Sequence, residues 1–378
     1  MIYVTVKQKR NDKQLKWEDF LFNEDPKIPK THFDETGTIT RKLFEPNKEM
    51  LKSVDIPGMI ALLKGFNTKY AHLFEKNREE LYDHFKIPKK TGGFRPIDAP
   101  KEELQTALRE LVFILTEKFG LLYHTAAFAY VKGRCITDAV KKHQINGSNW
   151  ILKTDFSGFF PSTTLDFTMN MMSTLWPVSE ICKSKTGKDE LRKALSLGFL
   201  NNSLPQGTVL SPMLTNLIMI PIDYTLFNEF AHRRFVYTRY ADDIHISCVQ
   251  SFDMNEVVQT IKEVLEIFHA PYEIKKEKTH YGSRKGRNKI LGLSLNAENN
   301  ITVGWREKKY WKSATNNLIM DYKNGKIWDV DEIRHYEGLL SYYKMVEPDC
   351  FDQLVRHYEE KYHVNLKKII KFSLNNGW

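Results

Sequence analysis

The 378-residue sequence lacks the features that mark several large classes of protein. Its four cysteines are widely scattered, with neither the paired spacing of a metal motif nor the compact pattern of a disulfide-rich fold. The N-terminus becomes charged too early for the apolar core of a signal peptide. No apolar run reaches the roughly 18 residues that a membrane-spanning helix needs. These absences exclude a disulfide scaffold and a membrane protein, and they favour a cytoplasmic protein with reduced thiols.

The charge of the chain is strongly positive. It contains 56 Lys and Arg against 47 Asp and Glu, a formal net charge of +9. Such an excess suggests a polyanionic partner such as a nucleic acid. The length exceeds that of a typical single domain, so we expect two or three subdomains.

Two adjacent acids, Asp242 and Asp243, interrupt an apolar run that extends from Phe235 to Ser247. The alternation on either side predicts a β-hairpin with its tip at Tyr240–Asp243. Neighbouring carboxylates repel each other, but a divalent cation between them and a third acid makes the arrangement favourable. A solvated turn is the ordinary interpretation of such a pair, so a third acid decides between the two.

Asp155 supplies that third acid. A buried-type strand from Trp150 delivers it, and the aromatic turn Phe156–Pro161 follows. Asp155 lies far upstream of the hairpin, so only a sheet with the two strands as neighbours would unite the three acids. They would then hold two Mg²⁺ ions, as in enzymes of in-line phosphoryl transfer.

Two turns with basic side chains precede Asp155. A Gly-Gly turn between Lys89 and Arg95 would let the backbone approach a ligand, and Arg95 suits triphosphate oxygens, although most such turns are solvated hairpins. A second turn carries Lys132 and Arg134 between a strand predicted at 127–131 and a helix. Basic residues beside aromatic ones suit a nucleic-acid strand.

A third turn lies between Asp155 and the hairpin. Pro205 and Gly207 enclose Gln206, whose amide would touch a sugar and a base edge. Ser211 then caps a long helix that Pro212 opens.

Further helices are predicted from apolar periodicity. They span Pro57–Phe85, Lys101–Phe119 and Asn255–His269, and a short strand is expected at Tyr3–Val6. From Val303 onward, basic residues alternate with aromatic residues, and helical segments follow.

The order of these motifs resembles that of reverse transcriptases. Asp155 with its aromatic turn, Leu204-Pro205-Gln206-Gly207 and Tyr240-Ala241-Asp242-Asp243 follow one another as in that family, and the likeness extends over roughly residues 88–300. The chain is most similar to the bacterial group, which includes retron, other phage-defence and group II intron enzymes.

The resemblance implies an α+β, right-hand polymerase fold with fingers, a palm built on an antiparallel sheet, and a helical thumb. The expected domains are an N-terminal extension with the start of the fingers at 1–86, fingers at 87–150, palm at 151–302 and thumb at 303–378.

It also implies roles for individual residues. Asp155 and Asp242 would ligate two Mg²⁺ ions, with Mn²⁺ as an alternative ion, the Phe156 carbonyl as a further ligand and Asp243 as a weaker one. Lys278 would donate a proton to departing pyrophosphate, with Lys276 as its rival.

Other residues would bind the substrates. Phe160 resembles the ring that excludes a ribose 2′-OH, and Gln206 would line the nucleotide and template groove. Arg95, with Lys89 or Lys90, would hold the triphosphate. The residues expected to contact nucleic acid are Lys132, Arg134, Arg284, Arg287, Trp305 and Lys309.

The sequence therefore predicts a cytoplasmic RNA-directed DNA polymerase that copies a dedicated non-coding RNA in phage defence, with an RNA template, a primer and deoxynucleoside triphosphates as partners. A separate effector protein and self-association are left open. The alternatives are an RNA-binding scaffold with an inert site and a protein-primed or untemplated DNA synthase.

Overall fold

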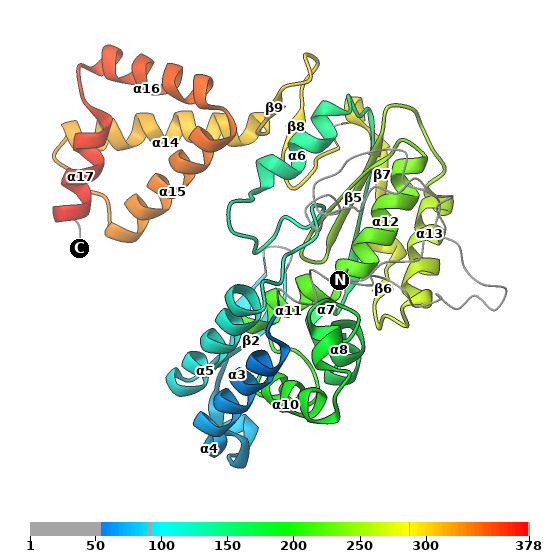
Figure 1. The fold of residues 1–378 in the computed structure, drawn as a ribbon. Coiled ribbons are helices and arrows are strands. Elements are labelled where there is room, and N and C mark those ends of the chain that lie inside the picture. The colour runs from blue at the N-terminus through cyan, green and yellow to red at the C-terminus, as the bar shows by residue number, and fades with distance from the viewer. Residues whose placement is uncertain (1–53, 90–91, 287, 377–378) are drawn as a thin grey trace. The chain divides into compact units, whose positions relative to one another are not determined.

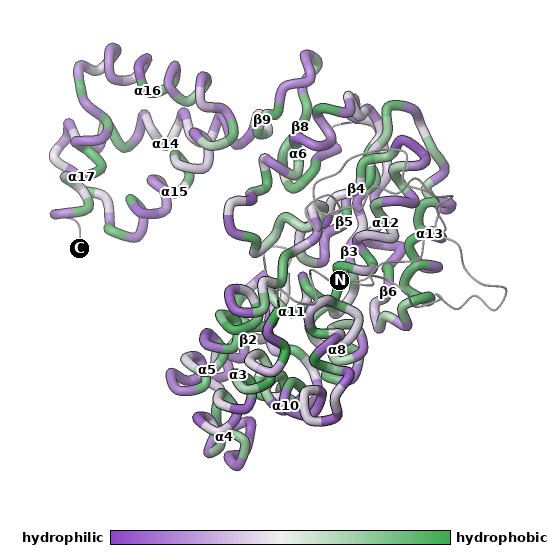
Figure 2. The backbone as a smooth tube through the Cα atoms, in the orientation of Figure 1, coloured by the Kyte–Doolittle hydropathy of each residue, from purple (hydrophilic) through white to green (hydrophobic). Residues whose placement is uncertain are grey.

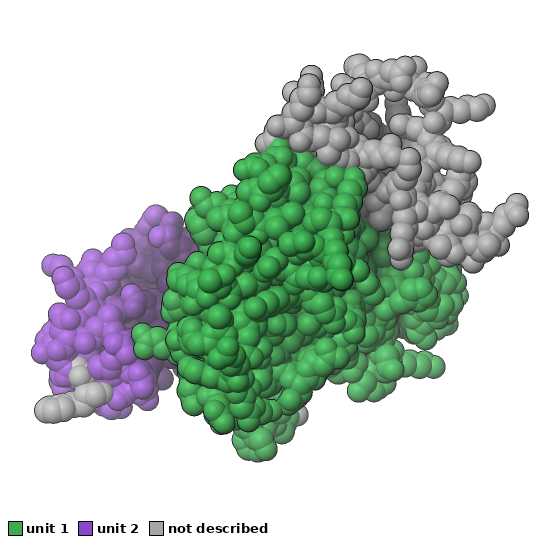
Figure 3. Space-filling view, turned by 60° about the horizontal axis from the view of Figure 1, so that its bottom comes forward, with its two compact units in different colours: residues 1–135, 152–247, 252–280 green, residues 136–151, 248–251, 281–378 purple. Residues whose placement is uncertain are grey.

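The structure, a computed structural model, describes residues 54–89, 92–286 and 288–376. The strand predicted at Tyr3–Val6 lies outside these residues. The chain divides into two compact units, coloured green and purple in Figure 3. The described part of unit 1 is 54–89, 92–135, 152–247 and 252–280, and that of unit 2 is 136–151, 248–251, 281–286 and 288–376. The predicted finger, palm and thumb boundaries stay predictions.

The predicted acidic hairpin is present. Strand β4 (Val236–Tyr240) pairs antiparallel with β5 (Asp243–Cys248), from Val236 opposite Ser247 to Tyr240 opposite Asp243. Ala241 takes a left-handed φ of 57° at the first position of the two-residue loop. Tight hairpins require a positive φ there, at a cost of roughly 1–2 kcal/mol for a residue with a Cβ.

Strand β3 (Trp150–Ser157), which carries Asp155, is the direct neighbour of β5. The sheet order is β4-β5-β3-β6, with β6 at Glu273–Ile274, and β7 (His280–Ser283) also pairs with β3. The neighbouring strands that the sequence required to unite the acids are confirmed.

Two helices cover this sheet (Figure 1). Helix α12 (Ile220–His232) packs on β4 and on α13 (Met254–Ile267), which also contacts β6. The helix predicted at Asn255–His269 is thereby confirmed within a residue or two, and it buries the apolar face that its periodicity indicated.

The region before the first basic turn is helical only in part. Helices α3 (Ile56–Lys69) and α4 (Ala71–Glu75) and the 3₁₀ turn η1 (Arg78–Leu81) form as expected, but Tyr82 begins strand β1 (Tyr82–Pro88). The helix predicted to reach Phe85 is wrong at its end, because β1 pairs along its whole length with β2 (Phe94–Pro100) and Phe85 lies exposed.

Two further local predictions need correction. The segment 127–131 is irregular, with a single bridge from Ala127 to Arg239, because Tyr130 takes a φ of 59°, which no strand accommodates. Helix α11 (Leu210–Ile218) begins before Ser211, whose hydroxyl donates to Pro205 O rather than capping the helix.

The other helices of unit 1 are short. Helix α5 (Glu102–Phe113) continues as a π-helical turn η2 (Ile114–Lys118), close to the predicted Lys101–Phe119. The remaining ones are α7 (Phe159–Ser162), α8 (Leu165–Met172), α9 (Val178–Ile181), α10 (Lys185–Ser196) and η3 (Lys276–Lys278).

Unit 2 contains four successive C-terminal helices whose polar and apolar residues alternate (Figure 2). Leu340, Tyr343 and Val346 are buried in it, whereas Met345 is exposed. Its elements are α6 (Ile136–Ile145), η4 (Arg284–Gly286), β8 (Ser294–Leu295), β9 (Ile301–Thr302), α14 (Trp305–Lys323), α15 (Val330–Val346), α16 (Pro348–Tyr362) and α17 (Leu366–Asn376).

Within the described ranges, no single helix has the length and apolar composition to cross a membrane. Helices α11 and α12 meet the test of length and composition only when taken together, across a bend of 48°.

Candidate active site

The sheet brings the three predicted acids to one place in unit 1. Asp155 lies near the end of β3, and the hairpin tip with Asp242 and Asp243 lies on the neighbouring β4–β5 pair. The Phe156 backbone N–H donates to the Asp242 carbonyl at 3.1 Å, which fixes the two chain segments against each other. Phe156 itself is buried, opposite Ile274 of β6.

Two lysines compensate this negative charge. Lys278 Nζ lies 2.5 Å from Asp155 Oδ2, and the hydrogen bond to Asp155 raises the pKa of Lys278. Lys153 Nζ lies 3.2 Å from Asp243 Oδ1. The sequence did not single out Lys153, although the two-residue repeat of a strand puts it on the same face as Asp155. Of the rivals Lys276 and Lys278, the structure brings Lys278 to the acids.

The surroundings of Asp242 disfavour the ionised form of its carboxyl. Burial, and then the charges of Asp243 and Asp155, raise the pKa of its carboxyl. Across the described residues, no group of three or more His, Cys, Asp or Glu side chains is arranged to hold a metal ion. Two of the three carboxylates form ion pairs with lysines instead. The donor chemistry nevertheless suits a hard divalent cation: oxygen ligands and a crowded negative charge that such an ion would offset.

Arg95 and Asp242 both influence the phenol of Tyr130. The pKa of the Tyr130 phenol is raised by its partial desolvation and then by Asp242 and Tyr240, and it is lowered by Arg95. The charges of Asp242 and Arg95 therefore both act on this phenol. Arg95 lies on β2, and Lys89 lies at the hairpin turn, where its backbone N–H donates to Gly93 O. Lys90, the alternative to Lys89, is outside the described residues.

The two adjacent phenylalanines of the aromatic turn, Phe159 and Phe160, differ in burial. Phe159 is buried between Phe156 and Tyr272, with centroid distances of 5.7 and 4.9 Å. Phe160 is only partly buried. Phe160 is therefore the ring that remains accessible to a ligand, while Phe159 belongs to the core.

Gln206 is held by the basic hairpin. Its backbone carbonyl accepts from Asp98 N of β2 at 2.7 Å, and the residue lines a cavity of about 290 Å³ together with Asp98 and Pro161. The cavity joins the turn of Gln206 to the residue that follows Phe160.

The residues predicted to contact nucleic acid differ in how far their side chains are engaged. Lys132 is exposed, and in unit 2 the exposed Trp305 lies under Lys309, with the ammonium 5.3 Å from the ring centroid. Arg134 Nη1 donates to His124 O and Ala127 O, at 2.6 and 2.7 Å.

In unit 2, Arg284 Nη1 donates to Asn299 Oδ1 at 2.7 Å. The guanidinium groups of Arg134 and Arg284 therefore bind other segments of the protein itself, a use that a count of basic residues does not reveal. Arg287 is outside the described residues.

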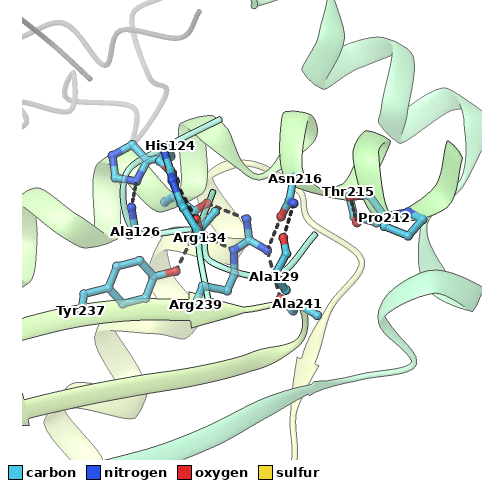
Figure 4. Close-up of polar contacts among 12 residues, drawn as sticks. His124, Ala126, Ala129, Arg134, Pro212, Thr215, Asn216, Tyr237, Arg239 and Ala241 are labelled. Carbon is cyan, nitrogen blue, oxygen red and sulfur yellow. Dashed lines mark hydrogen bonds and ion pairs between the residues drawn. The ribbon is translucent and has the colours of Figure 1, made fainter. Parts of the chain in front are cut away.

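A buried polar cluster beneath the hairpin was missed from the sequence. Arg239, taken as part of an apolar run, is fully buried (Figure 4). Its guanidinium forms an ion pair with Asp223 of α12. A charged residue within a buried strand needs a partner, and that rule was the available signal.

Comparisons with known proteins identify the family of this chain. The model of the reverse transcriptase (RNA-dependent DNA polymerase) family matches residues 87–295, more than half of the chain. The retron Ec83 reverse transcriptase of Escherichia coli is 29% identical over 301 residues, which cover 77% of this chain and 90% of that protein. The retron Mx65 reverse transcriptase of Myxococcus xanthus is 26% identical over 313 residues, covering 80% and 70%.

Among solved structures, a telomerase from Candida albicans in complex with a fragment of telomeric RNA has a TM-score of 0.42 and 13% identity. The match covers 79% of this chain and 61% of the telomerase chain, so this chain spans less than two thirds of it.

The class of protein is thus a nucleotidyltransferase with an α+β, right-hand polymerase fold, as the sequence predicted. The chain belongs to the reverse transcriptase family, the RNA-directed DNA polymerases, and within that family it is retron-like.

The raised pKa of Asp242 makes a prediction for the metal-free protein. A carboxyl whose pKa is raised by folding binds its proton more tightly in the folded state, so the stability it contributes is lost as pH rises through the folded pKa. We expect Asp242→Asn to raise the melting temperature in chelator at neutral pH, with the gain shrinking as the pH approaches about 4. Thermal melts across that pH range measure it.

Asp155→Asn is the matched control, because it removes the partner of Lys278 and should give no such gain. A lower melting temperature for Asp242→Asn at neutral pH would contradict the crowding of charge at this site.

Proposed function

We propose that this reverse transcriptase extends a primer with deoxynucleotides at the site formed by Asp155, Asp242 and Asp243. The observation that carries the proposal is the backbone hydrogen bond from Phe156 to Asp242, which joins the strand of the first acid to the hairpin of the other two. Few arrangements other than a cation site give a reason to crowd three carboxylates in this way.

Asp155 and Asp242 would hold two Mg²⁺ ions, or Mn²⁺, with Asp243 and the Phe156 carbonyl as further ligands. Bound there, the ions would stabilise the attacking and the leaving oxygens of phosphoryl transfer. Lys153 and Lys278 would exchange their contacts with the carboxylates for contacts with substrate phosphates.

Lys278 is proposed as the proton donor to pyrophosphate. Its ammonium group lies on Asp155 and is half exposed, so it is near the acids and accessible to a ligand. A lysine ammonium is protonated at neutral pH, which is the form that a proton donor needs. This contact supports Lys278 over Lys276.

Arg95 and Lys89 would bind the triphosphate, since a guanidinium forms paired hydrogen bonds to phosphate oxygens. Gln206 would lie under the nucleotide and template, and Phe160 would exclude a ribose 2′-OH. Phe160 is only partly buried, and Pro161, the next residue, lines a cavity together with Gln206, which supports both roles.

Lys132, Trp305 and Lys309 are the exposed residues that we propose as nucleic-acid contacts. Arg134 and Arg284 were predicted for the same role, but the hydrogen bonds of their guanidinium groups support a structural one.

The template is proposed to be a dedicated non-coding RNA, and the setting phage defence in the cytoplasm. This part rests on the resemblance to retron reverse transcriptases. An effector protein and self-association belong to the same hypothesis.

The metal assignment predicts the behaviour of the double variant Asp242→Asn, Asp243→Asn. It should lose Mg²⁺-dependent incorporation in a primer-extension assay by at least about a thousandfold, because both ions lose ligands. Its RNA affinity in a filter-binding assay should stay within about threefold, since phosphate contacts to basic residues elsewhere carry that binding. Asp166→Asn, at an exposed carboxylate on α8 bound to Arg192, is the control. Incorporation at the wild-type rate by the double variant would refute the assignment.

The gate assignment predicts that Phe160→Ala incorporates ribonucleotides. The ratio of kcat/KM for deoxy- and ribonucleotides should fall by about 10–200-fold, as the loss of a filled pocket wall allows. Phe159→Leu should instead lower stability and leave the ratio intact, because that ring packs in the core. Equal effects on the ratio in both variants would reject Phe160 as the gate.

The template hypothesis predicts what copurifies from the host. The wild-type protein should carry one enriched RNA and DNA complementary to it, and the double variant Asp242→Asn, Asp243→Asn should carry the RNA alone. Sequencing both nucleic-acid fractions checks this. RNA without DNA from the wild type would favour the scaffold, and DNA without a complementary RNA would favour the untemplated synthase.

A further inference from the structure

Arg239 lies fully buried in β4, three positions before Asp242 (Figure 4). Its Nε and Nη2 donate to Asp223 Oδ1 and Oδ2 at 2.8 and 2.7 Å, and neither side chain is exposed to solvent. Tyr237 Oη also donates to Asp223 Oδ1, at 2.8 Å. The Asp223 carboxylate therefore balances the charge of Arg239, and it occupies two of the three guanidinium nitrogens.

The third nitrogen serves the hairpin tip. Arg239 Nη1 donates to Ala241 O at 3.0 Å and to Asn216 Oδ1 at 3.1 Å. Ala241 is the residue with the left-handed φ, and its carbonyl belongs to the peptide bond that leads into Asp242. The planar guanidinium thus connects Asp223 of α12 to the peptide bond between Ala241 and Asp242, whose orientation determines where the Asp242 side chain points.

Asn216 extends the same contact to a second segment. Its Nδ2 donates to Ala129 O at 2.8 Å, while the backbone of Arg239 bonds to Ala126 O and Phe128 N at 2.7 and 2.9 Å. Tyr130 follows directly, held at a φ of 59° with its ring exposed. One buried amide on α11 therefore joins the acidic hairpin to the loop of Tyr130.

Stability alone does not account for this arrangement. Replacing a buried ion pair by apolar residues is often neutral or stabilising, so the pair by itself is weak evidence for a role in stability. A buried guanidinium needs partners for its remaining N–H groups wherever it lies, so the informative point is which partners it has. Here the contacts beyond Asp223 converge on the peptide before Asp242 and on the carbonyl before Tyr130, two positions at the candidate site.

We propose that Asn216 and Arg239 are positioning residues that hold the Asp242 hairpin tip and the 126–130 loop in the one arrangement that binds the catalytic cation. The inference rests on the proposed role of Asp242 as a metal ligand. Asn216 is the residue to test, because removing it leaves the ion pair of Arg239 and Asp223 intact.

The experiment compares Asn216→Ala and Asn216→Leu with two controls in the full-length protein. Tyr237→Phe removes a hydrogen bond from the opposite side of the cluster and leaves Ala241 held. Thr215→Ala removes a buried hydroxyl on the same helix, whose bonds to Ser211 O and Pro212 O stay within α11. Asn216→Leu keeps the volume of the site if the smaller side chain prevents folding.

Mn²⁺ alone is the probe, and its binding is followed by the electron paramagnetic resonance signal of the free ion, without nucleic acid. Urea unfolding of the same samples reports stability. We expect both Asn216 variants to bind Mn²⁺ about tenfold more weakly, as for other residues that orient metal ligands. The two controls should lose stability and keep the wild-type affinity. Primer extension should show the same separation.

Wild-type Mn²⁺ affinity in a folded Asn216 variant would overturn the inference, and so would losses in all four variants that simply follow their stability. Asp242→Asn separates this from failure of the site itself: if that variant also binds Mn²⁺ normally, the metal assignment is wrong, and if it alone binds weakly, only the positioning role is wrong.

Discussion

Mutual repulsion of three carboxylates at one end of a sheet is the constraint on which the site depends. Asp155, Asp242 and Asp243 approach because β3 and β5 are hydrogen-bonded neighbours, not because the side chains attract. Lys278 and Lys153 offset part of the charge from the solvent side. The side chains of Lys278 and Lys153 are 51% and 40% exposed, and ion pairs this open to solvent are weak, so a cation or a phosphate can displace them at low cost.

The hairpin and the strand of Asp155 could be predicted because each carries its own signal. Alternation, an apolar run and a turn are local properties, and they place the acids at strand ends without knowledge of the fold. Phe85 shows where such local signals fail. It fits a helical period with Leu81, yet β2 offers a whole strand of backbone partners, and that pairing overrides the period.

The roles of the basic residues could not be predicted in the same way. Lys132 and Arg134 stand two positions apart in one turn, but only Arg134 turns inward to two backbone carbonyls. Arg239 looks like an interruption of an apolar strand until its partner Asp223, from the preceding helix, is known. The sequence contains both members of each contact but carries no signal that pairs them, because pairing is decided by tertiary packing.

The turn of Gln206 and strand β2 are distant in sequence but are held together by a backbone contact. Its carbonyl accepts from Asp98 N, and Gly207, at a φ of 128°, packs so closely that an added Cβ would lie 2.8 Å from Asp98 O. The turn therefore cannot shift without β2, the strand that also carries Arg95. A residue proposed for the triphosphate and one proposed for the template groove then move together, so the nucleotide site depends on a backbone contact that tolerates only glycine.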